Sequence, residues 1–296
     1  VVSWTEKHID ELKEFQPSFF ELATMMGFCY FADKQVDVAI IEVGEPSNMQ
    51  SECRDRQNIK LLREEIELIQ YLARLGKKMV VIVYAGAALE MGDWIDCVDA
   101  VVWAGYGGQY VNEAVARVLS GKVNPSGRLT ETFPCHLEDV LAEHCYRDPE
   151  NMNYDDGLMV GYRYFETENI GVQFPFGYGL SYSNFEYSHL KATVLPNEVC
   201  VSFDITNTSD KDGKEVAQIY TGALADEEDR PNCELKGFKK VFVKAHSTKH
   251  VTISIPLDEL RYFSTKTNAW EKCKGILTIG VGKNAHTILM SKEIRV

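Results

Sequence analysis

The stretch Val36-Asp37-Val38-Ala39-Ile40-Ile41-Glu42-Val43-Gly44 decides the fold class of this chain. It is mostly apolar, it is rich in β-branched residues, and it ends at a glycine. A run of this length and composition is typical of a strand in a parallel sheet, which is buried on both faces. The sequence therefore predicts a buried parallel strand here, with a loop at its carboxyl end.

The segments around this strand alternate between helix and strand patterns. Helical spacing predicts a helix within residues 1–35, and a second helix follows the polar loop over residues 45–55 and ends at Gly76. Two further buried strands are predicted over residues 79–84 and 100–103, the latter leading into another helix. This alternation indicates an α/β layer structure with a largely parallel sheet, whose ligand site should lie at the carboxyl ends of the strands.

After Phe185 the pattern changes to short alternating strands separated by turns, which is typical of an all-β sandwich. The charge changes at the same place, because residues 1–185 carry a net −14 and residues 186–296 a net +1. Such a step indicates a domain boundary. We predict an α/β sandwich with a mostly parallel sheet over 1–184, incomplete at its start and including a connector. An all-β sandwich follows over 185–296.

Composition excludes several classes of partner. The chain has 296 residues with 31 Lys+Arg against 44 Asp+Glu, and this net charge of −13 argues against binding to a nucleic-acid backbone. No apolar run reaches the roughly 18 residues of a membrane helix, so no membrane partner is expected. The eight cysteines lack a C-x-x-C pair and no signal segment is evident, which favours a reducing, cytoplasmic location. We expect most of these thiols to be buried.

Five segments, in order along the chain, carry a family resemblance: residues 50–56 (QSECRDR), 121–129 (GKVNPSGRL), 160–165 (VGYRYF), 174–182 (FPFGYGLSY) and 234–238 (ELKGF). Together they resemble the glycoside hydrolase family 3 β-glucosidases, whose acid/base loop reads S-E-G-x-D-R. The resemblance implies three modules: a barrel with a nucleophilic Asp, an α/β sandwich with the acid/base, and a fibronectin type III-like domain. This chain resembles the second and third modules and shows no segment like the barrel.

The implied function is part of a retaining β-glycosidase that acts on a β-linked glucoside or oligosaccharide without a cofactor. Its site would be completed by a barrel module that carries the nucleophilic Asp, in the same gene or in a second chain. The chain alone is therefore expected to be inactive. The alternative is a non-catalytic carbohydrate-binding or assembly module, which the absent barrel and a departure from the family motif at Cys53 favour.

Glu52 is the candidate general acid/base. Retaining hydrolysis needs two carboxyl groups about 5–5.5 Å apart, and Glu52 matches the Glu of the family loop, although a loop Glu considered by itself is usually only solvated. Asp55 and Arg56 are expected to open the following helix and to support this loop. Cys53 replaces the family's Gly, which tolerates backbone conformations that Cys does not. No nucleophile is expected in this chain.

Other patterns give no cofactor or metal site. His246 and His250 have a metal-like spacing only on a helix, whereas a strand is predicted there, so we interpret them as surface histidines. Cys135-His136 and His144-Cys145 fit no zinc pattern. The run Gly105-Tyr106-Gly107-Gly108 lacks the spacing of a nucleotide loop and predicts a tight strand-to-helix turn. We interpret the aromatic residues between Tyr154 and Tyr187 as packing between modules rather than as sugar-stacking platforms.

Overall fold

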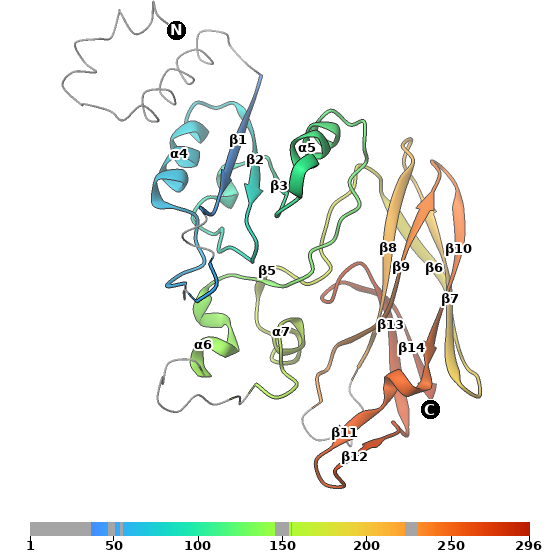
Figure 1. Cartoon of the computed structure of the whole chain (residues 1–296). Coiled ribbons are helices and arrows are strands. Elements are labelled where there is room, and N and C mark those ends of the chain that lie inside the picture. The colour runs from blue at the N-terminus through green and yellow to red at the C-terminus, as the bar shows by residue number, and fades with distance from the viewer. Residues whose placement is uncertain (1–36, 47–50, 54–55, 146–153, 155, 223–229) are drawn as a thin grey trace, which may run out of the picture.

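The structure, a computed structural model, describes residues 37–46, 51–53, 56–145, 154, 156–222 and 230–296. The helix predicted within residues 1–35 lies outside these ranges. A small sheet with its helices comes first along the chain and a larger β-sandwich comes second, and long connecting segments run between the two (Figure 1).

The first part contains a three-stranded parallel sheet. Its strands are β1 (Val38–Gly44), β2 (Lys78–Tyr84) and β3 (Ala100–Trp103), paired in the order β1-β2-β3. All three correspond to predicted strands, so the prediction of a parallel α/β sheet is confirmed. Gly44 lies directly against β2, because a Cβ atom there would lie 2.3 Å from the carbonyl oxygen of Tyr84. Only glycine fits at this end of the strand.

Helices and short elements complete the first part and the connector. These are α4 (Arg63–Ala73), η1 (Ile95–Cys97), η2 (Gly108–Tyr110), α5 (Val111–Leu119), β4 (Phe133–Pro134), η3 (Leu137–Asp139), α6 (Leu141–Cys145), α7 (Tyr162–Thr167) and β5 (Val172–Phe174). The helices α4 and α5 lie on either side of the small sheet (Figure 1). The strands β4 and β5 pair antiparallel within the connector.

The helix after the polar loop begins later than the sequence predicts. Arg56 does not open it, because α4 starts at Arg63, and Asp55 lies outside the described residues. Glu65 explains this start, because the backbone amide of Leu62 donates to its Oε2 at 3.2 Å, which satisfies a donor at the helix start. The prediction that Arg56 opens the helix is therefore wrong, and its side chain has another role.

The second part is an antiparallel β-sandwich, so the predicted fold class is confirmed. The elements are β6 (Phe185–Val194), β7 (Glu198–Asn207), β8 (Gly213–Thr221), β9 (Glu234–Val243), β10 (Thr248–Pro256), η4 (Leu257–Leu260), β11 (Tyr262–Ser264), β12 (Ala269–Glu271), β13 (Ile276–Gly282) and β14 (Ile288–Arg295). One sheet has the order β10-β7-β6 and the other the order β14-β13-β8-β9. The strands β11 and β12 form a separate two-stranded hairpin.

Each part has its own hydrophobic core. The core of the sandwich includes Phe203 and Ile219, and that of the α/β part includes Ile69 and Trp94, all with no exposed surface. A smaller cluster around Tyr220, Cys233 and Ala285 includes the partly buried Tyr162 of α7 and Phe176 of the connector. The Tyr162 and Phe176 rings stack with centroids 4.6 Å apart. These aromatic residues pack between the two parts, as the sequence predicts.

The cysteines are less buried than expected. Six cysteines have described side chains, and all six are free thiols. Cys233 and Cys273 are buried, whereas Cys53 and Cys97 are exposed and the other two are intermediate. The prediction of mostly buried thiols is therefore wrong for these six, because Cys53 lies in a surface turn and Cys97 at the exposed end of η1. Within the described ranges, no helix combines the length and the apolar character needed to span a bilayer.

Candidate functional site

The candidate acid/base Glu52 lies in the loop that follows β1, at the carboxyl edge of the parallel sheet. Its side chain is exposed, as are those of its neighbours Ser51 and Cys53. Glu52 lies in the chain between Glu45, the residue directly after β1, and Arg56. Glu52 is thus presented to solvent at the edge where parallel α/β sheets bind ligands.

An ion pair closes the base of this loop. The guanidinium of Arg56 donates from Nη2 to Oε1 of Glu45, the residue directly after β1. The side chain of Glu45 has no exposed surface, and that of Arg56 is 19% exposed. The backbone amide of Glu45 also donates to the carbonyl oxygen of Tyr84 at 3.0 Å, which continues the pairing of β1 with β2. A buried, charge-assisted pair of this kind fixes the two ends of a loop relative to the sheet.

Glu65 adds a second connection between the strand and the helix. Its Oε1 accepts a hydrogen bond from the backbone amide of Gly44 at 3.1 Å, while its Oε2 accepts from Leu62. Burial raises the pKa of Glu65, and the two backbone hydrogen bonds oppose that rise. One carboxylate therefore joins the end of β1 to the start of α4.

Cys53 keeps the backbone conformation that glycine favours. Its φ angle is +63°, in the left-handed region, which costs a non-glycine residue about 1–2 kcal/mol. Glycine, the residue of the family motif at this position, adopts positive φ angles without strain. Cys53 adopts a positive φ angle despite its Cβ atom.

Further carboxylates lie on neighbouring segments of the same part. The largely buried Glu90 accepts from Nζ of Lys60 at 3.0 Å and contacts Nδ1 of His136 at 3.1 Å. Glu131 is half-buried, and burial raises its pKa, while a hydrogen bond from the amide of Ala88 and the charge of Arg56 oppose the rise. Lys60 also pairs with Asp93 at 2.9 Å.

Sequence reasoning missed Glu45, Glu65, Glu90 and Glu131. One signal was available, since Glu45 directly follows a predicted buried strand that ends in glycine. Nothing in the sequence pairs Glu45 with Arg56 or Glu90 with Lys60, because these contacts depend on how the loops return to the sheet.

The Gly-rich segment after β3 forms the predicted strand-to-helix turn. Gly105 and Gly108 have φ angles of +57° and +70°, and η2 then leads directly into α5. These positive angles explain why glycine recurs here. The turn lies at the same carboxyl edge of the sheet as the loop of Glu52.

The histidines flagged by spacing lie on the surface. His246 contacts Oδ1 of Asp210 and His250 contacts Oδ1 of Asp204, both at 2.6 Å, and both imidazoles are more than half exposed. Their interpretation as surface residues is confirmed. In the part of the chain that the structure describes, no group of three or more His, Cys, Asp or Glu side chains is arranged to hold a metal ion.

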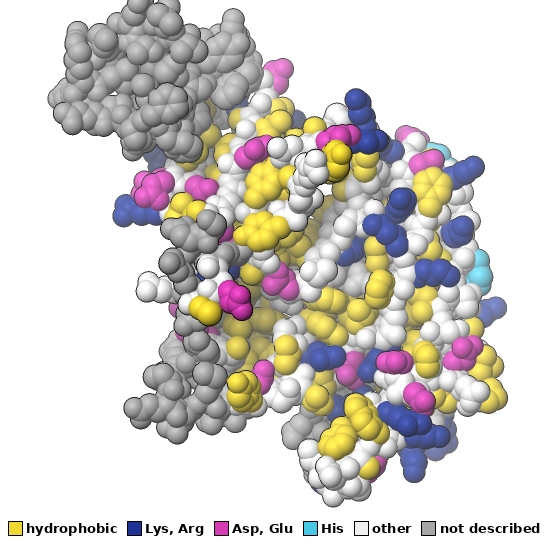
Figure 2. All heavy atoms as spheres, viewed as in Figure 1, with side chains coloured by type: hydrophobic (Ala, Val, Ile, Leu, Met, Phe, Trp, Pro, Cys, Tyr) yellow, Lys and Arg dark blue, Asp and Glu magenta, His cyan; other side chains and the backbone are white. Residues whose placement is uncertain are grey.

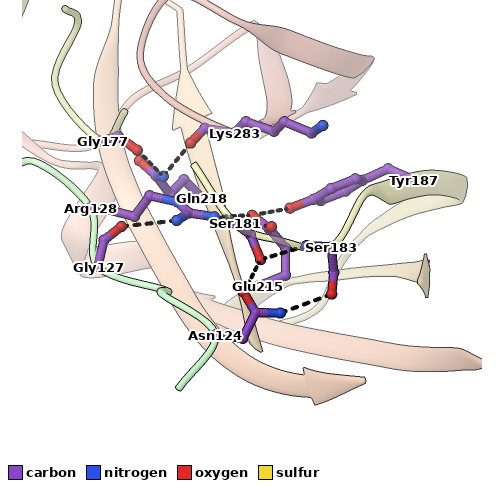
Figure 3. A network of polar contacts seen from close by, with 10 residues as sticks. All are labelled: Asn124, Gly127, Arg128, Gly177, Ser181, Ser183, Tyr187, Glu215, Gln218 and Lys283. Atoms are coloured by element: carbon purple, nitrogen blue, oxygen red, sulfur yellow. Dashed lines mark hydrogen bonds and ion pairs between the residues drawn. The ribbon is translucent and has the colours of Figure 1, made fainter. Parts of the chain in front are cut away.

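Two of the resemblance segments meet each other between the two parts. The amide of Leu129 donates to the carbonyl of Tyr178, and the amide of Gly177 donates to the carbonyl of Leu129, both at 2.8 Å. The side chain of Asn124 bonds to Ser181 and Ser183 at 2.9 Å (Figure 3). Segments 121–129 and 174–182 therefore form one structural unit.

This unit is joined to the sandwich by a buried polar network (Figure 3). Nη2 of Arg128 lies 2.9 and 3.0 Å from the two carboxylate oxygens of Glu215 on β8, and Tyr187 of β6 donates to the same carboxylate at 3.2 Å. Gln218 donates to the carbonyl of Gly177 at 3.1 Å. Gly177 has a φ of +82°, and a Cβ atom there would lie 2.1 Å from Oε1 of Gln218.

The chain matches two family models. Residues 30–182 match the model described as the glycosyl hydrolase family 3 C-terminal domain. Residues 215–285 match that of the fibronectin type III-like domain. Glu52 and Arg128 both fall in the first match, whereas Glu215 and Gln218 fall in the second.

Its relatives are longer proteins. The chain is 37% identical to thermostable beta-glucosidase B of Acetivibrio thermocellus, over 88% of this chain and 35% of that protein. It is 34% identical to an exo-alpha-(1->6)-L-arabinopyranosidase of Bifidobacterium breve, over 86% of this chain and 34% of that protein. The chain thus spans about a third of the length of these curated relatives.

Solved structures give the same match. The GH3 beta-glucosidase of Bifidobacterium adolescentis has a TM-score of 0.84 at 31% identity, over 88% of this chain and 39% of that one. The beta-glucosidase of Kluyveromyces marxianus in complex with glucose has a TM-score of 0.83 at 34% identity, over 88% of this chain and 32% of that one.

Proposed function

Because this chain belongs to glycosyl hydrolase family 3, we propose that it is the acid/base-bearing part of a retaining β-glycosidase acting on β-linked glucosides or oligosaccharides. Glu52 is the general acid/base. The observation that carries this role is an exposed carboxyl on a loop whose base the buried Arg56–Glu45 pair closes at the carboxyl edge of the sheet.

In this mechanism Glu52 acts twice. It first donates its proton to the glycosidic oxygen as the bond to the leaving group breaks, and its carboxylate then takes a proton from the water that hydrolyses the glycosyl-enzyme intermediate. Both steps require the carboxyl group to reach the sugar while its backbone stays fixed. Arg56 serves this requirement through Glu45, and Asp55 is proposed as a second support of the loop.

The nucleophile belongs to a barrel module elsewhere, in the same gene or in a second chain. Support comes from the other carboxylates near this edge, which are engaged with protein groups: Glu45 with Arg56, Glu90 with Lys60, and Glu131 with the amide of Ala88. The relatives are also about three times as long as the match. We therefore expect the 296-residue chain alone not to hydrolyse an aryl β-glucoside.

The test is Glu52→Gln in the complete enzyme, assayed on two β-glucosides that differ in leaving group. Hydrolysis of a disaccharide needs protonation of the leaving oxygen, whereas an activated nitrophenyl glycoside needs it little. We expect kcat/KM to fall at least a hundredfold more on the disaccharide, following the typical size of general acid catalysis. Equal losses on both substrates would refute the acid role.

Glu64→Gln is the matched control, because it makes the same charge change at an exposed position in the first turn of α4. The panel includes an α-L-arabinopyranoside, since one relative is named for that activity. If Glu52→Gln leaves every rate unchanged, the alternative of a non-catalytic carbohydrate-binding or assembly module is favoured. The cytoplasmic location and the boundary at residues 184–185 stay predictions.

A further inference from the structure

A pair of aromatic rings is exposed on the hairpin β11–β12. Phe263 and Trp270 are directly opposite each other in the antiparallel register, and their ring centroids lie 5.8 Å apart at 77°. Phe263 is 47% exposed and Trp270 is 66% exposed. Hydrophobic side chains gather on this hairpin, which projects at the lower end of the view (Figure 2). The edge-to-face contact orders both rings without burying them.

The base of the hairpin is held by polar contacts. The guanidinium of Arg230, a residue that is only 8% exposed, lies 5.4 Å from the ring centroid of Tyr262 and donates to Glu234 of β9 at 2.6 Å. The carboxylate of Glu271 accepts from Thr267 at 2.5 Å and from Tyr262 at 3.3 Å. The two rings therefore stand on a hairpin that is tied to the sandwich and closed across its own strands.

The size of this surface limits what can bind there. A Phe and a Trp side chain together offer no more than about 300–500 Å², and both rings are already partly covered. A specific protein interface buries about 1,200–2,000 Å² in total. The pair is therefore too small to hold a folded protein by itself and fits a flat ligand of one or two rings.

The charge of the hairpin limits the ligand further. Residues 262–271 contain one Lys and one Glu, and the wider segment 258–274 has four basic and three acidic residues, a net charge of only +1. The uncharged polar groups of the hairpin are the hydroxyls and the amide of Ser264, Thr265, Thr267 and Asn268. So small a net charge gives little electrostatic attraction to anionic lipids or nucleic acids, whose binding depends on clustered basic residues. A sugar ring presents C–H groups on its faces and hydroxyls at its rim, which suit aromatic rings beside uncharged hydrogen-bonding groups.

We propose that Phe263 and Trp270 form a second carbohydrate-binding site, which takes one or two units of a β-linked glucan apart from the loop of Glu52. The choice of a β-linked glucan rests on the proposed function. The ordered pair of exposed aromatic rings is observed in the structure and does not depend on that function. The site would retain a polymeric or oligomeric substrate on the fibronectin type III-like domain without taking part in bond cleavage.

The test is affinity electrophoresis of the 296-residue chain in native gels with and without soluble mixed-linkage β-glucan. We expect the polysaccharide to retard the wild-type chain and Trp270→Ala to weaken the retardation at least tenfold in apparent dissociation constant. Phe263→Ala should weaken it less, and Trp270→Tyr should keep most of it. Phe238→Ala is the matched control, because Phe238 is 67% exposed on β9 of the same sandwich.

Three results would overturn the proposal: no retardation of the wild type, equal retardation of Trp270→Ala and the wild type, or equal losses in Trp270→Ala and Phe238→Ala. Thermal unfolding of each variant checks the fold, and Trp270→Tyr keeps the test valid if the alanine variant is unstable. Glu52→Gln separates this inference from the proposed function. The polysaccharide should retard Glu52→Gln as strongly as the wild type. If Glu52 proves not to be the acid, the proposed binding site on the hairpin is unaffected. If the hairpin does not bind glucan, the proposed role of Glu52 is unaffected.

Discussion

Arg56 pairs with Glu45 across eleven residues of sequence, and this pair closes the loop that carries Glu52. The two side chains differ in exposure, since Glu45 is fully buried and Arg56 retains some contact with solvent. Removing Arg56 and removing Glu45 should therefore lower the free energy of unfolding by different amounts. Loss of Arg56 leaves a buried carboxylate without its cation, whereas loss of Glu45 leaves a guanidinium that water can reach.

We predict that Arg56→Ala lowers the free energy of unfolding by about 3 kcal/mol, in the usual range for breaking a buried pair. Glu45→Ala should cost less, and the double variant should cost less than the sum of the two, because the partners are in direct contact. Urea unfolding of the three variants measures this. Arg63→Ala is the control, since Arg63 is 87% exposed in its pair with Glu67 and should change stability by less than about 0.5 kcal/mol. Strictly additive effects would contradict the prediction.

Cys53 provides a second prediction about the same loop. Because the φ angle of Cys53 is positive, Cys53→Gly should relieve about 1 kcal/mol of backbone strain in the folded state. Glycine also raises the conformational entropy of the unfolded chain, which offsets part of this stabilisation. Cys53→Val should be clearly destabilising, since a β-branched residue tolerates this conformation poorly. Thermal unfolding should therefore rank the variants as Gly at or above Cys, and Cys above Val. If Val proves as stable as Gly, the loop does not hold a left-handed residue here.

The pair of Arg128 and Glu215 should couple the two parts of the chain. Their side chains are 9% and 3% exposed, so Arg128→Ala leaves a buried carboxylate and should cost about 3–5 kcal/mol. Arg128→Lys should recover only part of this, because Lys cannot reproduce the planar fork of a guanidinium. Calorimetry is the informative measurement, since we expect one unfolding transition in the wild type and two in Arg128→Ala. Arg117→Ala, in an exposed pair with Glu113, is the control. A single unshifted transition in Arg128→Ala would show that the contact does not couple the parts.

The fold was largely predictable because it depends on local patterns. Residues 36–44 predict β1 from composition alone, and alternating apolar positions predict strands such as β7. The start of α4 was not predictable in this way. It depends on Glu65, whose carboxylate accepts from Leu62, the residue directly before the helix, and from Gly44 at the end of β1. A contact over 21 residues leaves no periodic signal in the sequence.

The candidate site was predictable only in part. Family resemblance makes Glu52 a candidate acid/base and Asp55 and Arg56 candidate supports, which stay predictions, but only the structure shows that Arg56 contacts Glu45. Segments 121–129 and 174–182 resemble family motifs, and the structure gives their physical role at the junction with the sandwich. Gly177 shows why the sequence does not reveal this role. A side chain at this position would collide with Gln218, which lies 41 residues away in the sequence.

Glu131 gives a pH-dependent prediction next to the candidate site. Burial raises the pKa of its carboxyl above the ordinary value of 4.5, so the folded chain holds a proton that the unfolded chain releases. The contribution of Glu131 to stability is therefore complete below about pH 4.5 and is lost as the pH rises through the folded pKa. Glu131→Gln resembles the protonated carboxyl at every pH. Its free energy of unfolding, relative to the wild type, should rise between pH 4 and pH 7 in urea titrations at constant salt. A difference that stays flat over this range would show that the carboxyl of Glu131 is solvated like a surface residue.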